Sequence, residues 1–518
     1  MPFVFRPSVS CQARLTALAF SFLGALALTV ATPPDAHATS KLRRNGNGPD
    51  NGRTYLHKGT RVTLPGAEQL PPTVIAALIK EKIPLSALSI YVEKIGSTVP
   101  LIDLHGDAAM QPASTMKLVT TYSGLSMLGP DYRWKTTAYA DGTLIGGVLH
   151  GNLYIKGTGD PKLVPEELVD LVNQIHQAGI VGLEGDLVLD KGYFDASTRN
   201  APPLDEEADA PYNVGPDPLL YAFKSLSFTM HPDFPGRQVG IDVLPPLAQL
   251  HVNNQLKLSH GPCLSAALTP DLTPNADGTV DAIFSGEYSA RCGDHVTNIA
   301  VLDHTAFFSG GFLALWQQTG GTFKGTVREG ATPATAHAVG EHKSPPLGDI
   351  VHDINKFSNN VMARNLFLTI GAVEGKPPAT TAASAAIIRT WLTKNNIAIP
   401  ELVLDNGSGL SRDERITAVG LAELLQSANQ SPVAQVFTDS LPIAGVDGTM
   451  RRRLANQPVV GNARIKTGTL SDVRAIAGYV ASQNGDTFVV VSFINSPRSE
   501  AGRSIHDALL EWIYQSAH

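Results

Sequence analysis

The sequence predicts a multidomain α/β protein, and two observations support this prediction. The chain has 518 residues, of which 43% are hydrophobic and 17% charged, so it has apolar material for two to four domains. Helical and strand patterns alternate near both ends, whereas short β-rich runs dominate between Lys135 and about Gly340. We therefore expect the outer parts to form one α/β domain, with the middle inserted into it.

The charge balance excludes one class of function. Forty Lys and Arg residues stand against 47 Asp and Glu residues, which gives a formal charge of −7 without a basic or acidic tail. A nucleic-acid-binding protein usually shows a basic excess, so we expect no nucleic-acid partner.

The N-terminus has the pattern of a secretory signal peptide over residues 1–38. Arg6 and Arg14 precede an uncharged stretch, Leu15–Val30, and the small-residue pattern Ala36-His37-Ala38 follows it. A retained membrane anchor is the alternative, but this stretch is short for a membrane span. We expect cleavage after Ala38, no integral membrane span thereafter, and export to the periplasm.

The cysteines fit an exported protein. Cys11 lies in the signal segment, which leaves Cys263 and Cys292 in the mature chain. Oxidising compartments favour pairing, so we expect a disulfide between them; two unrelated buried thiols are the alternative.

Ordered structure is expected from about residue 67, after a polar, Gly- and Asn-rich leader at 39–66. Apolar spacing after Pro71-Pro72 predicts a helix, and Leu118, Tyr122, Leu125 and Leu128 form the apolar stripe of another, which Gly129-Pro130 ends. The expected elements in this part are the helix Pro72–Lys82, the strands Leu88–Lys94 and Leu101–His105, and the helix Ser114–Leu128.

The middle of the chain alternates short strands with turn clusters such as Gly157–Pro161. The expected strands are Asn152–Lys156, Gly185–Leu189, Gln238–Val243, Leu250–Leu258, Thr279–Phe284 and Thr297–Val301. Two helices are expected there, Pro165–Ala178 and Ser309–Thr319.

Helices return after Pro345. Strands near the C-terminus need partners, and pairing them with the strands after Leu88 would close one sheet. The expected elements are the helices Leu347–Lys356, Val361–Ile370, Ala383–Asn395 and Ala418–Ala428, the strands Ala475–Ser482 and Thr487–Ile494, and the helix Ser499–Gln515. The last helix has one apolar stripe, which indicates core packing rather than a membrane-surface anchor.

The first chemical pattern is Ser114-Thr115-Met116-Lys117. A serine and a lysine three residues apart on a helix share one face. A serine hydroxyl becomes nucleophilic when a neighbouring base accepts its proton, and a shielded lysine with a lowered pKa can be that base. The pattern alone is weak, because a surface helix produces it by chance.

Two further patterns strengthen this interpretation. Ser358 and Asn360 are two residues apart between two helices, although Ser427-Ala428-Asn429 matches equally well. In the run Lys466-Thr467-Gly468-Thr469, a strand would place Lys466 and Gly468 on one face. The glycine would let a substrate backbone approach, and the lysine would attract a carboxylate.

These three motifs, in this order, resemble the penicillin-recognising serine acyl-transferases, whose signature is Ser-x-x-Lys, Ser-x-Asn and Lys-Thr-Gly. The long separation of Ser114 from Ser358 resembles the low-molecular-mass class C penicillin-binding proteins, which are D-alanyl-D-alanine carboxypeptidases/endopeptidases of peptidase family S13. Stretches such as Tyr212-Asn213-Val214 and Asp405–Ser411 are also similar to that family. The chain departs from it at Asn359, where Asp is common, and at Arg364, where an acidic residue is expected.

The resemblance implies a β-lactamase-like transpeptidase domain, an antiparallel sheet with helices, interrupted by two nested domains. The implied boundaries are 67–134 with 341–518 for the catalytic domain, 135–200 with 300–340 for domain II, and 201–299 for domain III.

The resemblance also implies a mechanism. Lys117 would take the proton of Ser114, which attacks the penultimate D-Ala of a peptidoglycan stem peptide, and the backbone N–H groups of Ser114 and Thr469 would form the oxyanion hole. Ser358 would relay a proton. The substrate-binding residues would be Asn360, Lys466, Thr467, Gly468 and Thr469.

The implied partners are peptidoglycan stem peptides and, as covalent inhibitors, β-lactam antibiotics; a homodimer is left open. No cofactor and no metal are expected, and His337 and His342 lack the H-E-x-x-H or H-x-x-E-H spacing of a zinc site. A serine β-lactamase and a non-catalytic cell-wall-binding protein are the alternative functions.

Overall fold

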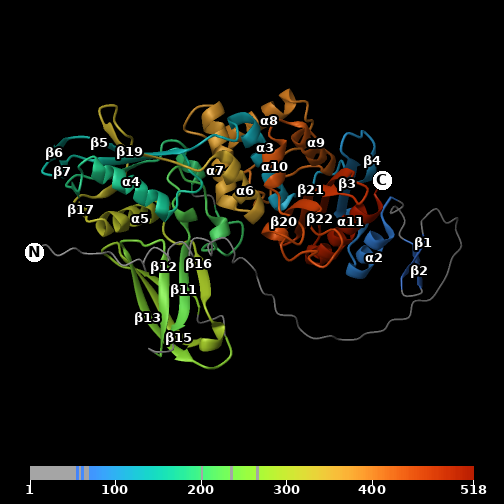
Figure 1. The fold of residues 1–518 in the computed structure, drawn as a ribbon, viewed down its shortest axis with the longest axis horizontal. Coiled ribbons are helices and arrows are strands. Elements are labelled where there is room, and N and C mark those ends of the chain that lie inside the picture. The colour runs from blue at the N-terminus through green and yellow to red at the C-terminus, as the bar shows by residue number, and fades with distance from the viewer. Residues whose placement is uncertain are drawn as a thin grey trace, which may run out of the picture. The chain divides into compact units, whose positions relative to one another are not determined.

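A computed structural model gives the fold of the chain (Figure 1). It describes residues 54–57, 60–63, 69–199, 202–233, 237–263 and 268–517. The signal peptide expected at 1–38 lies outside the described residues. Within the predicted leader, the structure has an antiparallel pair of strands, β1 (Thr54–His57) and β2 (Thr60–Thr63). The flexible leader itself stays a prediction. Both strands contain threonine, and β2 also valine, residue types that favour extended backbone.

A five-stranded antiparallel sheet joins the two ends of the chain, as expected. Its β22 pairs with β3 along seven residue pairs, from Ile494↔Leu88 to Phe488↔Lys94. In spatial order the sheet contains β20 (Ala463–Leu470), β21 (Val473–Ala481), β22 (Thr487–Asn495), β3 (Leu88–Lys94) and β4 (Pro100–Leu104).

The alternation of side chains along β21 separates two hydrophobic cores, one on each face of this sheet. Ala477 and Tyr479 lie in one core, whereas Ile476 and Val480 lie in the other. The second core contains α2 (Pro72–Glu81) and α11 (Arg503–Ser516). Because Ile505, Leu509 and Ile513 of α11 are buried in it, the predicted core packing of the last helix is confirmed.

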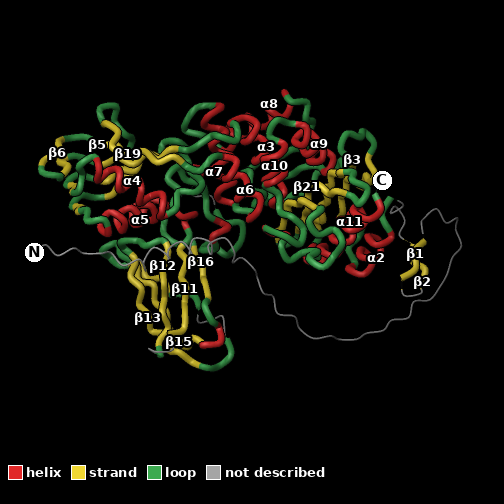
Figure 2. Tube along the Cα trace, in the orientation of Figure 1, coloured by secondary structure: helices red, strands yellow, loops and turns green. Residues whose placement is uncertain are grey.

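The first core contains the helices that lie between the first and third motifs in the sequence and pack on this face of the sheet. Figure 2 shows this part as mostly helical. The helices are α3 (Lys117–Leu128), α6 (Leu347–Phe357), α7 (Asn360–Glu374), α8 (Thr381–Lys394), α9 (Ala418–Gln430) and α10 (Ala434–Asp439).

The middle of the chain is rich in strands, as predicted, and has its own hydrophobic core. Its largest sheet has the order β18-β10-β8-β5-β19, with α4 (Pro165–Gln177) and α5 (His304–Gln318) contributing to the same core. The strands of this sheet are β5 (Lys135–Ala140), β8 (Leu153–Gly157), β10 (Leu187–Asp190), β18 (Val327–Glu329) and β19 (His337–Lys343).

Three smaller sheets complete the inserted part. The first is β17 (Thr322–Phe323), β9 (Gly182–Leu183), β7 (Val148–His150) and β6 (Thr143–Ile145). The second is β12 (Gln238–Leu244), β11 (Leu226–Asp233) and β16 (His295–Ile299). The third is β13 (Leu250–Ser259), β15 (Val280–Ser289) and β14 (Asp271–Pro274). One hydrophobic cluster contains strand residues of both predicted inserted domains, so it does not divide them. The division of the chain into domains therefore stays a prediction.

Two further expectations can be compared with the structure. Cys263 and Cys292 form a disulfide, which confirms the predicted pairing. Helix α5 begins at His304, five residues before the predicted start at Ser309, because Asp303 caps it by accepting a hydrogen bond from the Ala306 N–H. None of the described helices has both the length and the apolarity to cross a bilayer.

Candidate active site

The first motif lies at the edge of the antiparallel sheet, in a 3₁₀ turn rather than within an α-helix. The turn covers Ala113–Met116, and α3 starts only at Lys117. Ala113 has a φ of 46°, a left-handed conformation that is costly for a residue with a Cβ atom. This backbone directs the chain so that Ser114 is half-buried while Thr115 and Met116 are buried.

Gly468 of β20 allows the third motif to pack against this turn. A Cβ atom at residue 468 would lie 2.7 Å from the carbonyl oxygen of Pro112 and 3.1 Å from the Cβ of Ala113. Any side chain would therefore push the strand away from the nucleophile. The glycine predicted to admit a substrate also determines how closely β20 approaches Ser114.

Lys117 is fully buried and has three polar neighbours. Its Nζ lies 3.0 Å from Ser114 Oγ and donates to Asn360 Oδ1 at 2.6 Å and to the carbonyl oxygen of Ser408. The last two oxygens can only accept a hydrogen bond, whereas the serine hydroxyl can also donate one. A neutral amine has two N–H groups and one lone pair, so this environment places the lone pair toward Ser114.

The electrostatics of the site favour that neutral form. Burial lowers the pKa of Lys117 well below its usual value, and the positive charges of Lys466 and Arg364 lower it further, against an opposing contribution from Glu414. Lys466 of the third motif therefore acts electrostatically on Lys117 of the first.

The second and third motifs meet through Ser358 and Lys466. Ser358 ends α6 in a left-handed conformation, with φ 57° and ψ 35°, and its Oγ accepts a hydrogen bond from Lys466 Nζ at 2.7 Å. Lys466 is fully buried and also donates to the carbonyl oxygen of Thr467 at 2.9 Å. Burial lowers the pKa of Lys466 to about 7.

Asn360 lies between the nucleophile and the inserted part of the chain. Its Oδ1 accepts from Lys117, and its Nδ2 donates to the carbonyl oxygen of Tyr212 at 3.0 Å. The sequence predicted a contact with the substrate amide, whereas the side chain in the structure positions Lys117 and binds residue 212.

The two departures from the family pattern have clear structural roles. Asn359 caps α7, since its Oδ1 accepts a hydrogen bond from the Met362 N–H at 3.1 Å, and Asn and Asp cap helices equally well. Arg364 donates from Nη1 to the carbonyl oxygens of Asn213 and Val214, at 3.1 and 2.6 Å. It thus joins α7 to the inserted segment while placing a cation near Lys117.

The other residues of the third motif are more accessible. Thr467 is half-buried and donates from Oγ1 to Thr449 Oγ1 at 2.9 Å, and Thr469 is exposed. Lys466 and Gly468 are both buried, so they share one face of β20 as predicted. The structure therefore brings all the predicted site residues of the three motifs to one end of α3, α6 and β20.

The loop at 405–411 contributes to the site in a way that sequence reasoning missed. The side chain of Glu414 is fully buried, and its Oε1 accepts hydrogen bonds from the backbone N–H groups of Asp405, Asn406 and Gly407. This holds the loop so that the Ser408 carbonyl oxygen reaches Lys117. A backbone acceptor leaves no residue-type signal, and the only sign in the sequence is that Asn and Gly residues, which favour turns, gather at 406–409.

Comparisons with known proteins agree with this geometry. The model of the D-Ala-D-Ala carboxypeptidase 3 (S13) family matches residues 72–516. A D-alanyl-D-alanine carboxypeptidase of an Actinomadura species is 28% identical over 425 residues, covering 79% of this chain and 78% of that protein. D-alanyl-D-alanine carboxypeptidase DacB of Haemophilus influenzae is 26% identical over 423 residues, covering 79% and 85%.

The fold is also that of solved structures. The crystal structure of penicillin binding protein 4 from Haemophilus influenzae is similar with a TM-score of 0.70 at 24% identity, over 85% of this chain and 99% of that one. A second structure of that protein, complexed with a β-lactam, gives a TM-score of 0.67. The predicted fold class is confirmed.

Proposed function

The chain belongs to the D-Ala-D-Ala carboxypeptidase 3 (S13) family, and we propose that it is a serine DD-peptidase of peptidoglycan stem peptides that uses Ser114 as nucleophile and Lys117 as base. The observation that carries the proposal is the contact between Lys117 Nζ and Ser114 Oγ at 3.0 Å, in a buried site with two further acceptors for the amine.

In the first step, Lys117 accepts the proton of Ser114, and Oγ attacks the carbonyl carbon of the penultimate D-Ala. The backbone N–H groups of Ser114 and Thr469 stabilise the oxyanion that forms. When the C–N bond breaks, the proton held by Lys117 passes through the Ser358 hydroxyl to the leaving amine, so Ser358 keeps its own proton count. Ser358 Oγ accepts a hydrogen bond from Lys466 Nζ, which leaves its hydroxyl hydrogen free to be donated to the amine. Water then hydrolyses the acyl-enzyme and restores Ser114.

The remaining motif residues bind the substrate. Lys466, when protonated, attracts the terminal carboxylate, and Thr467 and Thr469 lie beside it on β20. Gly468 lets the peptide backbone approach the strand edge. Asn360 holds Lys117 and, by exchanging its contact with Tyr212, binds the substrate amide.

A β-lactam carries a comparable carbonyl group and a carboxylate, so it acylates Ser114 in the same way and leaves slowly. A serine β-lactamase would need an efficient base for deacylation, whereas a cell-wall-binding protein without activity would need no aligned Lys117 and Ser114. We further propose export to the periplasm through the signal peptide at 1–38 and the three-domain division given above.

The mass of the intact protein after incubation with benzylpenicillin tests the proposal. We expect one penicillin per chain, lost in Ser114→Ala. The matched control is Ser427→Ala, because Ser427 belongs to the second Ser-x-Asn sequence but hydrogen-bonds Tyr122, 3.0 Å away, instead. An adduct that persists in Ser114→Ala would contradict the assignment of the nucleophile.

A digest of purified peptidoglycan then identifies the reaction. Loss of one alanine from pentapeptides indicates carboxypeptidase activity, and conversion of cross-linked dimers to monomers indicates endopeptidase activity. Rapid turnover of penicillin with peptidoglycan unchanged would favour the β-lactamase alternative.

A further inference from the structure

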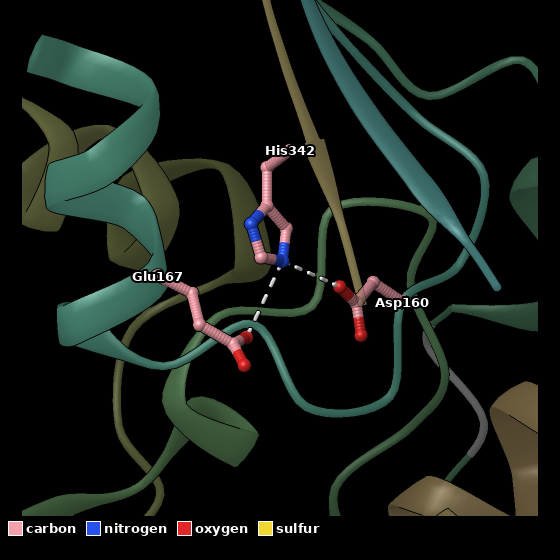
Figure 3. A group of neighbouring side chains, drawn as sticks. All are labelled: Asp160, Glu167 and His342. Carbon is pink, nitrogen blue, oxygen red and sulfur yellow. Dashed lines mark ion pairs between the residues drawn. The ribbon is translucent and has the colours of Figure 1, made fainter. Parts of the chain in front are cut away.

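A buried cluster of one histidine and two carboxylates lies in the inserted part of the chain (Figure 3). Asp160 follows β8, Glu167 lies in the first turn of α4, and His342 is on β19. His342 Nε2 lies 3.5 Å from Asp160 Oδ2 and 3.4 Å from Glu167 Oε2.

The three facing atoms are buried and pair only with one another. Asp160 is only 1% exposed, and the side chains of Glu167 and His342 are 21% and 11% exposed. Among the described residues, none makes a hydrogen bond to Asp160 Oδ2, Glu167 Oε2 or His342 Nε2, although Asp160 Oδ1 accepts from the Lys162 N–H at 2.9 Å. Buried carboxylates are costly unless a cation lies beside them, and here one imidazole nitrogen and two carboxylate oxygens face a shared point at which a metal ion could bind all three.

The two separations from His342 Nε2 match the edges of a tetrahedral zinc site. Zinc binds histidine nitrogen and carboxylate oxygen at about 2.0–2.1 Å, which places neighbouring ligand atoms about 3.3–3.4 Å apart. The three ligand atoms lie within 4.8 Å of one another. Ca²⁺ and Mg²⁺ prefer six or more oxygen ligands, whereas imidazole favours zinc and other transition metals.

The charges also match. Two carboxylates neutralise a divalent ion, and a neutral imidazole supplies the third bond.

From this geometry we propose that Asp160, Glu167 and His342 bind a Zn²⁺ ion, with water at the fourth position. The sequence spacing around His342 did not predict it, because the ligands come from three separate segments. The ion would hold the loop after β8 against α4 and β19. The same loop contacts the helices of the catalytic motifs, through Asn365 Nδ2 to the Gly159 carbonyl oxygen at 3.0 Å and Lys162 Nζ to Asp353 at 2.7 Å. We therefore assign the ion a structural role.

The test uses the tag-free full-length mature protein, stripped with EDTA and titrated calorimetrically with ZnCl₂. We expect one tight site per chain and a rise in the midpoint of thermal unfolding that EDTA reverses. Because even the loss of an outer-shell partner weakens metal sites about 10–100-fold, His342→Gln and Glu167→Gln should each weaken binding at least about 100-fold. Co²⁺ in place of zinc should give the visible absorption of a tetrahedral site.

The matched control is His150→Gln, since His150 pairs with Glu184 at 2.8 Å in the same inserted part but is largely exposed. It should bind Zn²⁺ as the wild type does. Labelling with penicillin confirms that each variant is folded, and if His342→Gln fails to fold, Glu167→Gln decides. Absence of a one-to-one site, or equal affinity in wild type and Glu167→Gln, would overturn the proposal and leave the cluster as an internal ion pair.

Discussion

Replacement of Lys117 tests the proposed base directly. Arginine keeps the positive charge but stays protonated in proteins, so Lys117→Arg cannot accept the serine proton. Lys117→Met keeps a similar volume and removes both charge and basicity, and it serves if the larger guanidinium does not fit. Both variants lose the lone pair that faces Ser114 Oγ at 3.0 Å.

The structure indicates how large the loss should be. A general base typically contributes about 10²–10⁴-fold to the rate. Lys117 is fully buried, so bulk water cannot take over its role. We therefore expect acylation to slow by about 10³–10⁴-fold, which corresponds to about 4–5.5 kcal/mol of transition-state stabilisation.

The assay is the second-order rate constant for labelling by a fluorescent penicillin, with circular dichroism as the test of folding. The control is Lys191→Arg, a buried lysine of the inserted part that pairs with Asp217 at 2.8 Å and Glu329 at 3.0 Å. It should be acylated at the wild-type rate. If a folded Lys117→Arg protein were acylated within a few-fold of wild type, the base would have to be reassigned, with Ser358 the next candidate.

Three further predictions follow from the same structure. Because the pKa of Lys466 is lowered to about 7, the protonated form that binds a carboxylate declines above that pH, and KM for a D-Ala-D-Ala peptide should rise on the alkaline side. Lys466→Arg should abolish that rise, since arginine stays protonated. An unchanged pH profile in this variant would refute the assignment. Gly468→Ala should slow acylation by about 10²-fold, because the added Cβ displaces β20 from the nucleophile, whereas Gly261→Ala, which has open space around it, should not. The Cys263–Cys292 disulfide closes a loop with a sequence separation of 29 residues, which the chain-entropy model equates with roughly 3–4 kcal/mol of folding stability. Reduction should therefore lower the midpoint of thermal unfolding and leave the acylation rate unchanged. A reduced protein with an unaltered midpoint would count against this estimate.

Local patterns predicted the regular elements well, because strong periodicity and punctuating residues determine them. The strand Leu88–Lys94 has the bounds expected from its run of β-formers, and Gly129 ends α3 as expected. Pairing between β22 and β3 was predicted from the need of both strands for partners. The hairpin at 54–63 was not predicted, since its short strands stand within a polar, glycine-rich stretch whose composition indicated disorder.

Motif order predicted the residues that we propose to react, whereas it did not predict the residues that surround and hold them. Ser114, Lys117, Ser358 and Lys466 carry side-chain chemistry that a pattern can express. The Ser408 carbonyl and the carboxylate of Glu414 act through tertiary placement alone. The same limit applies to the cluster at Asp160, whose members are brought together by the sheet and α4 rather than by spacing along the chain.

The two lysines of the site show why this placement matters for the chemistry. Both are fully buried, and burial lowers the pKa of each, yet the proposed mechanism needs Lys117 neutral and Lys466 charged. Their surroundings make the two pKa values differ. Burial lowers both, but the pKa of Lys117 is lowered further by two nearby cations, Lys466 and Arg364. Arg364, the residue that departs from the family pattern, therefore adds to the difference in the direction that catalysis requires. An acidic residue there would favour the protonated form of Lys117 and oppose its action as a base.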